Sequence, residues 1–162
     1  MSNENDRLNS QTDREVSSED AAATVTLTIP CTPEYVGTAR LTILGVASRM
    51  GFSYDQVEDI RLAVGEACAN AIERAKILKV ENPLITIRSL VEPSKLTVEV
   101  EDHTDNPSGE GIDQDKPAAE IESMNSQELG ALLMEILVDE VSVEPASGGG
   151  TRVRLVKFAN ES

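Results

Sequence analysis

The sequence predicts an α/β (α+β) two-layer sandwich, in which a mixed, mostly antiparallel sheet has helices packed on one face. Three observations support this fold class. The expected elements follow the order β-α-α-β-β-loop-α-β-β, which has too few helices for alternating βαβ units. Two consecutive strands form a hairpin, which makes the sheet antiparallel there. Of the 162 residues, 40% are hydrophobic and only 2% are aromatic, so one aliphatic core of ordinary size is expected.

The first predicted elements are a strand and a helix. Residues 24–29 alternate threonine with aliphatic side chains, and this period of two predicts a half-buried strand. Thr32 is expected to cap a helix that has Pro33 at its first position. This helix is predicted to end near Met50, because Gly51 follows it.

A second helix is predicted from Ser53 to about Lys79. Ser53 and Gln56 have the spacing of a capping box, in which each side chain bonds the other residue's backbone N–H. Apolar residues at helical spacing follow, and Cys68 among them is expected to be a small buried hydrophobe. The Asn82-Pro83 pair closes the segment.

The remaining elements complete the sheet and add one helix. Residues 84–91 and 96–101 read as a hairpin around a Glu-Pro-Ser-Lys turn. A third helix begins after Asn125 or Ser126, either of which is a good cap. The last two strands are expected at 141–143 and 153–156.

The net charge of −15 is concentrated in two segments. Residues 1–22 hold six acidic and two basic residues, and we interpret them as a disordered acidic tail. Residues 99–128 hold ten acidic and one basic residue. The predicted domain therefore spans 23–162 and includes an acidic lid loop at 102–125. With few aromatic residues and no basic surface, direct nucleic-acid binding is excluded as the main role.

The sequence also indicates the compartment. No apolar run reaches the length of a membrane span, and the N-terminus lacks the apolar region of a signal peptide. Cys31 and Cys68 are too few for a disulfide framework. We therefore expect a cytoplasmic protein with no membrane association.

Several polar residues have spacings that suit chemistry. Glu66 and Asn70 lie four apart on the second helix and so share a face. A carboxylate there can accept a proton, and an amide oxygen can ligate Mg²⁺, although the same spacing suits a solvated pair. Asp102 at a strand end can accept from an adenine amino group or simply start a turn. Gly130 can let backbone N–H groups approach phosphates. The sole histidine, His103, is expected to be exposed and non-catalytic.

The order of these features resembles a known family. The segment at 59–71 reads D-I-R-L-A-V-G-E-A-C-A-N-A, and Leu129-Gly130 precedes L-V-D-E-V at 137–141. The sequence G-T-R-V-R-L follows at 150–155. Over residues 24–158 the chain is similar to bacterial anti-sigma factor serine/threonine kinases of the RsbW and SpoIIAB type, in the GHKL ATPase superfamily with the Bergerat fold.

This resemblance implies ATP or ADP and Mg²⁺ as ligands and assigns a role to each matching residue. Glu66 matches the catalytic base of the family's N-box, and Asn70 matches its Mg²⁺ ligand. Asp102 matches the adenine-reading aspartate. Gly130 matches a glycine of the second glycine box, and Thr151 matches a threonine near the adenine.

The resemblance also implies protein partners. They are a sigma factor and an anti-anti-sigma protein of the STAS type, which is phosphorylated on Ser or Thr. Arg40 lies in the family's partner-binding region on the first helix, and a homodimer is expected. The implied function is transcription regulation by partner switching in a stress response.

Three departures from the family pattern leave an alternative open. The family follows its adenine aspartate with glycines in the pattern D-x-G-x-G, but Thr104 and Asn106 stand at those two positions here. Gln127 and Glu128 stand in place of an Arg-Gly pair, and Arg74 replaces a histidine. The alternative is a degenerate, non-catalytic binding module of the same fold that regulates by partner switching alone.

Overall fold

The computed structural model describes residues 23–103 and 125–159. The predicted tail at 1–22 and the part of the predicted lid loop at 104–124 lie outside the described residues. The elements, in chain order, are β1 (Ala23–Pro30), the 3₁₀ helix η1 (Pro33–Tyr35), α2 (Val36–Ala47), α3 (Tyr54–Leu78), β2 (Leu84–Glu92), β3 (Lys95–Asp102), α4 (Ser126–Leu137), β4 (Glu140–Pro145) and β5 (Thr151–Phe158).

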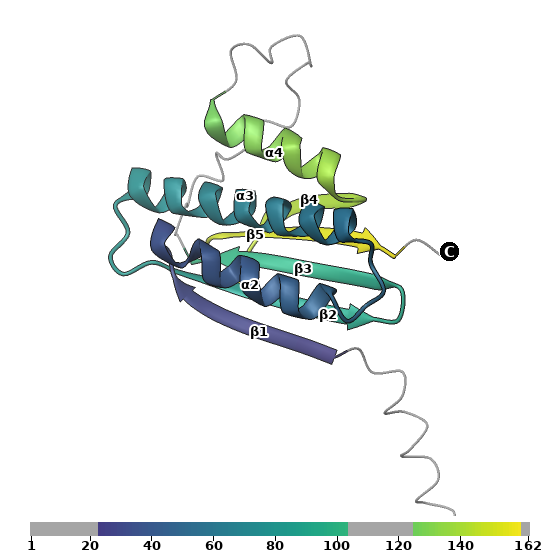
Figure 1. The fold of residues 1–162 in the computed structure, drawn as a ribbon. Coiled ribbons are helices and arrows are strands. Elements are labelled where there is room, and N and C mark those ends of the chain that lie inside the picture. Colours follow the sequence, from purple (N-terminus) through teal and green to yellow (C-terminus); the bar gives the residue numbers. More distant parts are fainter. Residues whose placement is uncertain (1–22, 104–124, 160–162) are drawn as a thin grey trace, which may run out of the picture.

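The strands of the described residues form one sheet in the order β1-β2-β3-β5-β4. Every neighbouring pair is antiparallel, so the expected mostly antiparallel sheet is antiparallel throughout this part of the chain. The helices lie together on one face of the sheet (Figure 1). This arrangement confirms the predicted two-layer sandwich.

The core lies between this sheet face and α3. Ile87 is paired with Val100 across β2 and β3, and both side chains are buried. Because strand side chains alternate between faces, Asp102 emerges on the same face as Val100. Asp102 is only 1% exposed. The strand register therefore places a carboxylate at the edge of the aliphatic core.

The predicted capping box at the start of α3 is confirmed. The Ser53 backbone N–H donates to Gln56 Oε1 at 3.0 Å, and the Gln56 backbone N–H donates to Ser53 Oγ at 3.2 Å. At the other end, Lys79 adopts a left-handed conformation with φ of 52° and closes the helix. The boundaries of this helix were thus available from the sequence.

The first helix has Thr32 at its N-cap and Pro33 at its first position, as predicted, but the predicted side-chain cap and the predicted C-terminal end were wrong. Thr32 makes no capping hydrogen bond with its side chain, and a 3₁₀ turn precedes α2. The reason is that the Thr32 carbonyl accepts from the Tyr35 N–H in an i→i+3 bond, which winds this turn tightly. At the C-terminal end, α2 stops at Ala47 rather than Met50, and a turn leads to Gly51 with φ of 76°.

Both ends of α4 are fixed by side chains. Asn125 Oδ1 accepts from the Glu128 backbone N–H at 2.9 Å, which makes Asn125 the cap. Lys157 Nζ of β5 donates to the Leu137 carbonyl at 2.8 Å. A cation at this position satisfies a terminal carbonyl and complements the helix dipole.

The start of the predicted acidic segment is neutralised within the sheet. Arg152 Nε lies 3.3 Å from carboxylate oxygens of both Glu99 and Glu101, on the face opposite the helices. Arg88 Nη1 lies 3.9 Å from the same two carboxylates. Three of the ten acids in 99–128 belong to β3, because Asp102 is the third, and arginines pair with all three.

Among the described residues, no helix is both long enough and apolar enough to span a bilayer.

Candidate functional site

The candidate site is built on a polar stripe along α3. Glu66, Asn70 and Arg74 follow one another at intervals of four residues, so their side chains emerge on one face of the helix. Asn70 is only 4% exposed, and Glu66 is half-buried. The side chain of Arg74 is 12% exposed. The stripe therefore lies under other elements rather than in open solvent.

At one end of the stripe, Gly130 of α4 packs against Glu66 and Asn70. A Cβ added at Gly130 would lie 3.0 Å from Glu66 Oε2 and 3.2 Å from Asn70 Oδ1. These distances are tighter than ordinary carbon contacts, so the missing side chain is what allows the approach. The Asn70 amide also donates to the Gln127 carbonyl at 3.4 Å. The structure thus brings together three of the predicted site residues, which we call the Glu66–Asn70 end.

Gln127, whose carbonyl lies at this end, also has a polar side chain. Its Nε2 atom is buried and makes no hydrogen bond with the described residues. A buried donor without a partner is costly, which makes it a candidate for contact with a ligand.

At the other end of the stripe, Arg74 and Asp102 form an ion pair. Arg74 Nη2 and Nε donate to Asp102 Oδ2 at 2.5 and 3.2 Å. The second carboxylate oxygen, Oδ1, accepts from the Thr151 backbone N–H at 3.2 Å. The structure therefore brings the predicted residues Asp102 and Thr151 together, with Arg74 added, and we call this the Arg74–Asp102 end.

Gly150 fixes the approach of β5 to Asp102. Its φ is +90°, a conformation that L side chains rarely adopt. A Cβ at this position would lie 2.1 Å from the Asp102 carbonyl oxygen. The glycine-rich turn therefore reverses the chain and also brings the Thr151 backbone N–H within hydrogen-bond distance of the buried Asp102 carboxylate.

Arg40 of α2 lies apart from this stripe. Its guanidinium packs over Gly65 of α3, where a Cβ would come within 2.5 Å of Arg40 Nη2. Gly65 and Glu66 are successive residues and so point about 100° apart around the helix. Arg40 Nε is buried and makes no hydrogen bond with the described residues.

The two thiols are buried, and the histidine is exposed. Burial raises the pKa of Cys31 to about 11 and that of Cys68 to about 12, so both are protonated at neutral pH. The nearby Asp102 carboxylate adds to the rise of the Cys31 pKa. Cys68 is fully buried, as predicted. His103 is exposed, with Nε2 3.4 Å from Thr86 Oγ1.

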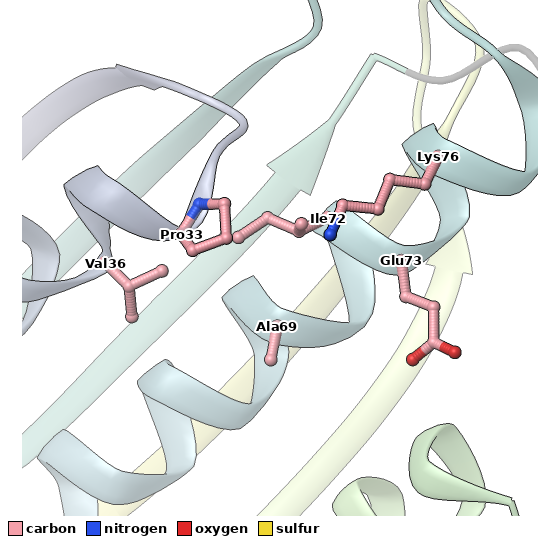
Figure 2. A pocket seen from close by; sticks show the side chains of 6 residues that line it. All are labelled: Pro33, Val36, Ala69, Ile72, Glu73 and Lys76. Atoms are coloured by element: carbon pink, nitrogen blue, oxygen red, sulfur yellow. The ribbon is translucent and has the colours of Figure 1, made fainter.

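A pocket of about 330 Å³ opens between the start of α2 and α3. Figure 2 shows Glu73 pointing towards α4, away from Pro33 on the α2 side. Glu73 Oε2 accepts from Ser126 Oγ at 3.0 Å, which ties α4 to α3. None of the predicted site residues lines this pocket. Its lining residues are Pro33, Val36, Ala69, Ile72, Glu73 and Lys76.

Two features of the site were not predicted from the sequence: the ion pair of Arg74 with Asp102 and the unpartnered side-chain amide of Gln127. Arg74 was noted only as a substitution, yet its spacing from Asn70 already put it on the same helix face. Its ion pair with Asp102 joins residues 28 apart in the chain, and no local pattern signals such a contact. The unpartnered amide of Gln127 likewise depends on how α4 docks on α3.

Comparison with known proteins finds a matching domain family and similar kinases. Residues 29–157 match the histidine kinase-like ATPase domain. The serine-protein kinase RsbW of Bacillus subtilis is 39% identical over 140 residues, which cover 84% of this chain and 86% of that protein. RsbW of Listeria monocytogenes (serovar 1/2a) is 36% identical over 146 residues, covering 85% and 88% respectively.

Two solved structures share the fold. The RsbU and RsbW domains of a Mycobacterium tuberculosis protein superpose with a TM-score of 0.61 at 18% identity, covering 86% of this chain and 33% of that one. A chain of the SiaB-SiaC complex from Pseudomonas aeruginosa also gives 0.61, at 11% identity, covering 93% and 98%.

Proposed function

The chain belongs to the histidine kinase-like ATPase domain family and to its RsbW-type branch, and from this premise we propose that it is an anti-sigma factor with kinase activity. In this proposal it binds a sigma factor and transfers a phosphoryl group from Mg-ATP to Ser or Thr of an anti-anti-sigma partner of the STAS type. The observation that carries the proposal is the convergence of Glu66, Asn70 and Gly130 where α4 meets α3.

The residues at this end fit a magnesium nucleotide. Gly130 leaves room that a Cβ would fill, and the buried Gln127 Nε2 is a donor that suits a phosphate oxygen. Asn70 offers an amide oxygen, a ligand type that Mg²⁺ accepts. The described residues hold no cluster of three or more His, Cys, Asp or Glu that could bind a metal. Mg²⁺ at Asn70 would take its other ligands from phosphates and water, as is usual for nucleotide sites.

Each residue then has a chemical task. Bound Mg-ATP supplies the phosphoryl group and part of the charge neutralisation. The Glu66 carboxylate accepts the proton of the partner's hydroxyl, because no described side chain pairs with it. Asn70 holds the metal, and Asp102 accepts from the adenine amino group, with the Thr151 N–H fixing the carboxylate.

The partner surface is proposed around α2. Arg40 holds a charged group between α2 and α3, and we assign it to partner binding because its buried Nε lacks a described acceptor. The proposal includes a homodimer, an N-terminal acidic tail at 1–22 and a lid at 102–125. Copurification with sigma factors in mild salt tests the partner assignment, and recovery of none contradicts it.

The kinase proposal is tested with Glu66→Gln. We expect Mg-ATP to bind this variant as it binds the wild type, while phosphorylation of a STAS-type partner falls about 10²- to 10⁴-fold, because a positioned base contributes that much. Calorimetry measures binding, and transfer from radiolabelled ATP measures the reaction. Glu58→Gln is the matched control, since Glu58 lies on the same helix and pairs only with Arg61 among the described residues.

A second candidate function rests on a specific observation. Asp102, the proposed adenine reader, is already bound by Arg74, and Thr104 and Asn106 stand where the family's two glycines follow the aspartate. These features favour a binding module of the same fold that acts by partner switching without catalysis. Absence of calorimetric heat at millimolar Mg-ATP, together with intact sigma-factor binding, would establish this function instead.

A further inference from the structure

In the Arg74–Asp102 pair, the Asp102 carboxylate accepts hydrogen bonds from donors within the chain. Two nitrogens of the guanidinium donate to Oδ2, and the Thr151 N–H donates to Oδ1. The Asp102 side chain has no exposed surface. Both oxygens therefore have donors before any ligand arrives.

A nucleobase amino group is a weak competitor for this carboxylate. It offers neutral N–H donors, whereas the guanidinium offers a charged, two-pronged donor set, and charge-assisted hydrogen bonds are about twice as strong. Binding of the amino group to Oδ2 must therefore displace Arg74 or share the oxygen with it. Either route lowers the affinity for the nucleotide relative to a pocket without the arginine.

We propose that Arg74 is a determinant of nucleotide affinity and base recognition, because it pairs with Asp102 and competes with the amino group of an adenine base for that carboxylate. This inference rests on the proposed nucleotide site, since it assigns Asp102 to base recognition. Arg74 is a long cationic side chain that lies one helical turn beyond Asn70 on α3. Arg74 thus acts through Asp102 as a positioning residue and takes no part in the chemical step.

The test compares two nucleotides that differ at the amino group. ADP carries the amino donor, whereas inosine diphosphate has a carbonyl oxygen in its place. Binding of each, with Mg²⁺, is measured by calorimetry for the wild type, Arg74→Met and Arg74→Lys. Methionine keeps an apolar stem without donors, and lysine keeps the charge but loses the two-pronged geometry.

We expect Arg74→Met to bind ADP at least about tenfold more tightly than the wild type, because the competing donor is gone. Inosine diphosphate should gain less than about twofold, since the carbonyl oxygen that replaces the amino group cannot donate to Asp102. Arg74→Lys keeps a buried cation beside Asp102 and should fold if the methionine variant does not. It should show a smaller gain that is again confined to ADP. The control Arg61→Met removes a partly buried arginine of the same helix that pairs with Glu58, and it should leave both affinities unchanged.

The outcomes separate this inference from the proposed function. Equal or weaker ADP binding by both variants, with binding retained by the wild type, overturns the inference and leaves the nucleotide site in place. The same holds if both nucleotides gain equally. If neither nucleotide binds any form, the inference and the nucleotide site fail together. Binding of ADP that appears only in the variants supports both.

Discussion

The two ends of the α3 stripe differ in how their charges are satisfied. At the Arg74–Asp102 end, a fully buried carboxylate has a guanidinium and a backbone N–H as partners. At the Glu66–Asn70 end, a half-buried carboxylate lies against a bare glycine, and no described side chain pairs with it. Burying a charge requires partners, whereas a partly exposed charge remains available to a ligand. The first end therefore contributes to folding, whereas the second leaves a carboxylate accessible for the base role that we propose for Glu66.

The largest expected effect comes from Asp102→Asn at the paired end. This change leaves the Arg74 guanidinium largely buried without its counter-charge, which costs about 3 kcal/mol in the free energy of unfolding. Urea denaturation measures the loss. Glu92→Gln is the control, because Glu92 pairs with Lys95 at 3.9 Å on the surface and should cost less than about 0.5 kcal/mol. Equal losses in the two variants would mean that the buried pair contributes nothing special.

Gly150→Ala tests how strongly the backbone conformation at the Arg74–Asp102 end contributes to stability. The new Cβ would overlap the Asp102 carbonyl in a backbone with φ of +90°, so we expect a loss of about 2 to 3 kcal/mol. Thermal and urea unfolding measure it. Gly148→Ala, in the same turn, meets no atom within 4 Å and should be close to neutral. A Gly150→Ala protein as stable as the wild type would contradict the close approach of Gly150 to the Asp102 carbonyl.

Gly130→Ala tests the Glu66–Asn70 end. The added methyl must push Glu66 or Asn70 by a few tenths of an ångström, and alanine favours the helix, so stability should change by less than about 1 kcal/mol. Mg-ADP affinity should fall about tenfold, because the displaced side chains belong to the proposed site. Gly45→Ala on α2 is the matched control, since nothing lies within 4 Å there. A large loss of stability with unchanged affinity would reverse the contrast between the two ends.

The smallest expected effect concerns the uncharged side of α3, at Cys68. Burial raises the pKa of this thiol to about 12, above its ordinary value of 9.0. The unfolded chain therefore releases this proton first, and the stability it contributes is complete below pH 9 and decreases as the pH rises towards 12. At pH 10 the loss is about 1 kcal/mol.

Comparing wild type with Cys68→Ala at pH 7 and pH 10 isolates this contribution. The packing cost of the substitution is present at both pH values and cancels in the difference. We expect the wild type to lose about 1 kcal/mol more than the variant between the two values. An identical pH dependence would show that the thiol does not titrate differently in the folded state.

Much of the fold followed from local patterns. The capping box at Ser53 and the cap at Asn125 are short-range hydrogen bonds, and the sequence displays both partners within three residues. The hairpin of β2 and β3 is likewise local. The side-chain cap predicted at Thr32 is absent because the Thr32 backbone makes the turn, and residue type alone does not distinguish these two hydrogen bonds.

The candidate site divides in the same way. The spacing of Glu66, Asn70 and Arg74 alone puts them on one face of a helix, because the α-helical repeat sets that relation within a single element. What this face contacts, Gly130 at one end and Asp102 at the other, follows from the packing of distant elements. Those contacts join residues tens of positions apart, and they depend on strand register and on how α4 docks, which the packing of the whole core sets.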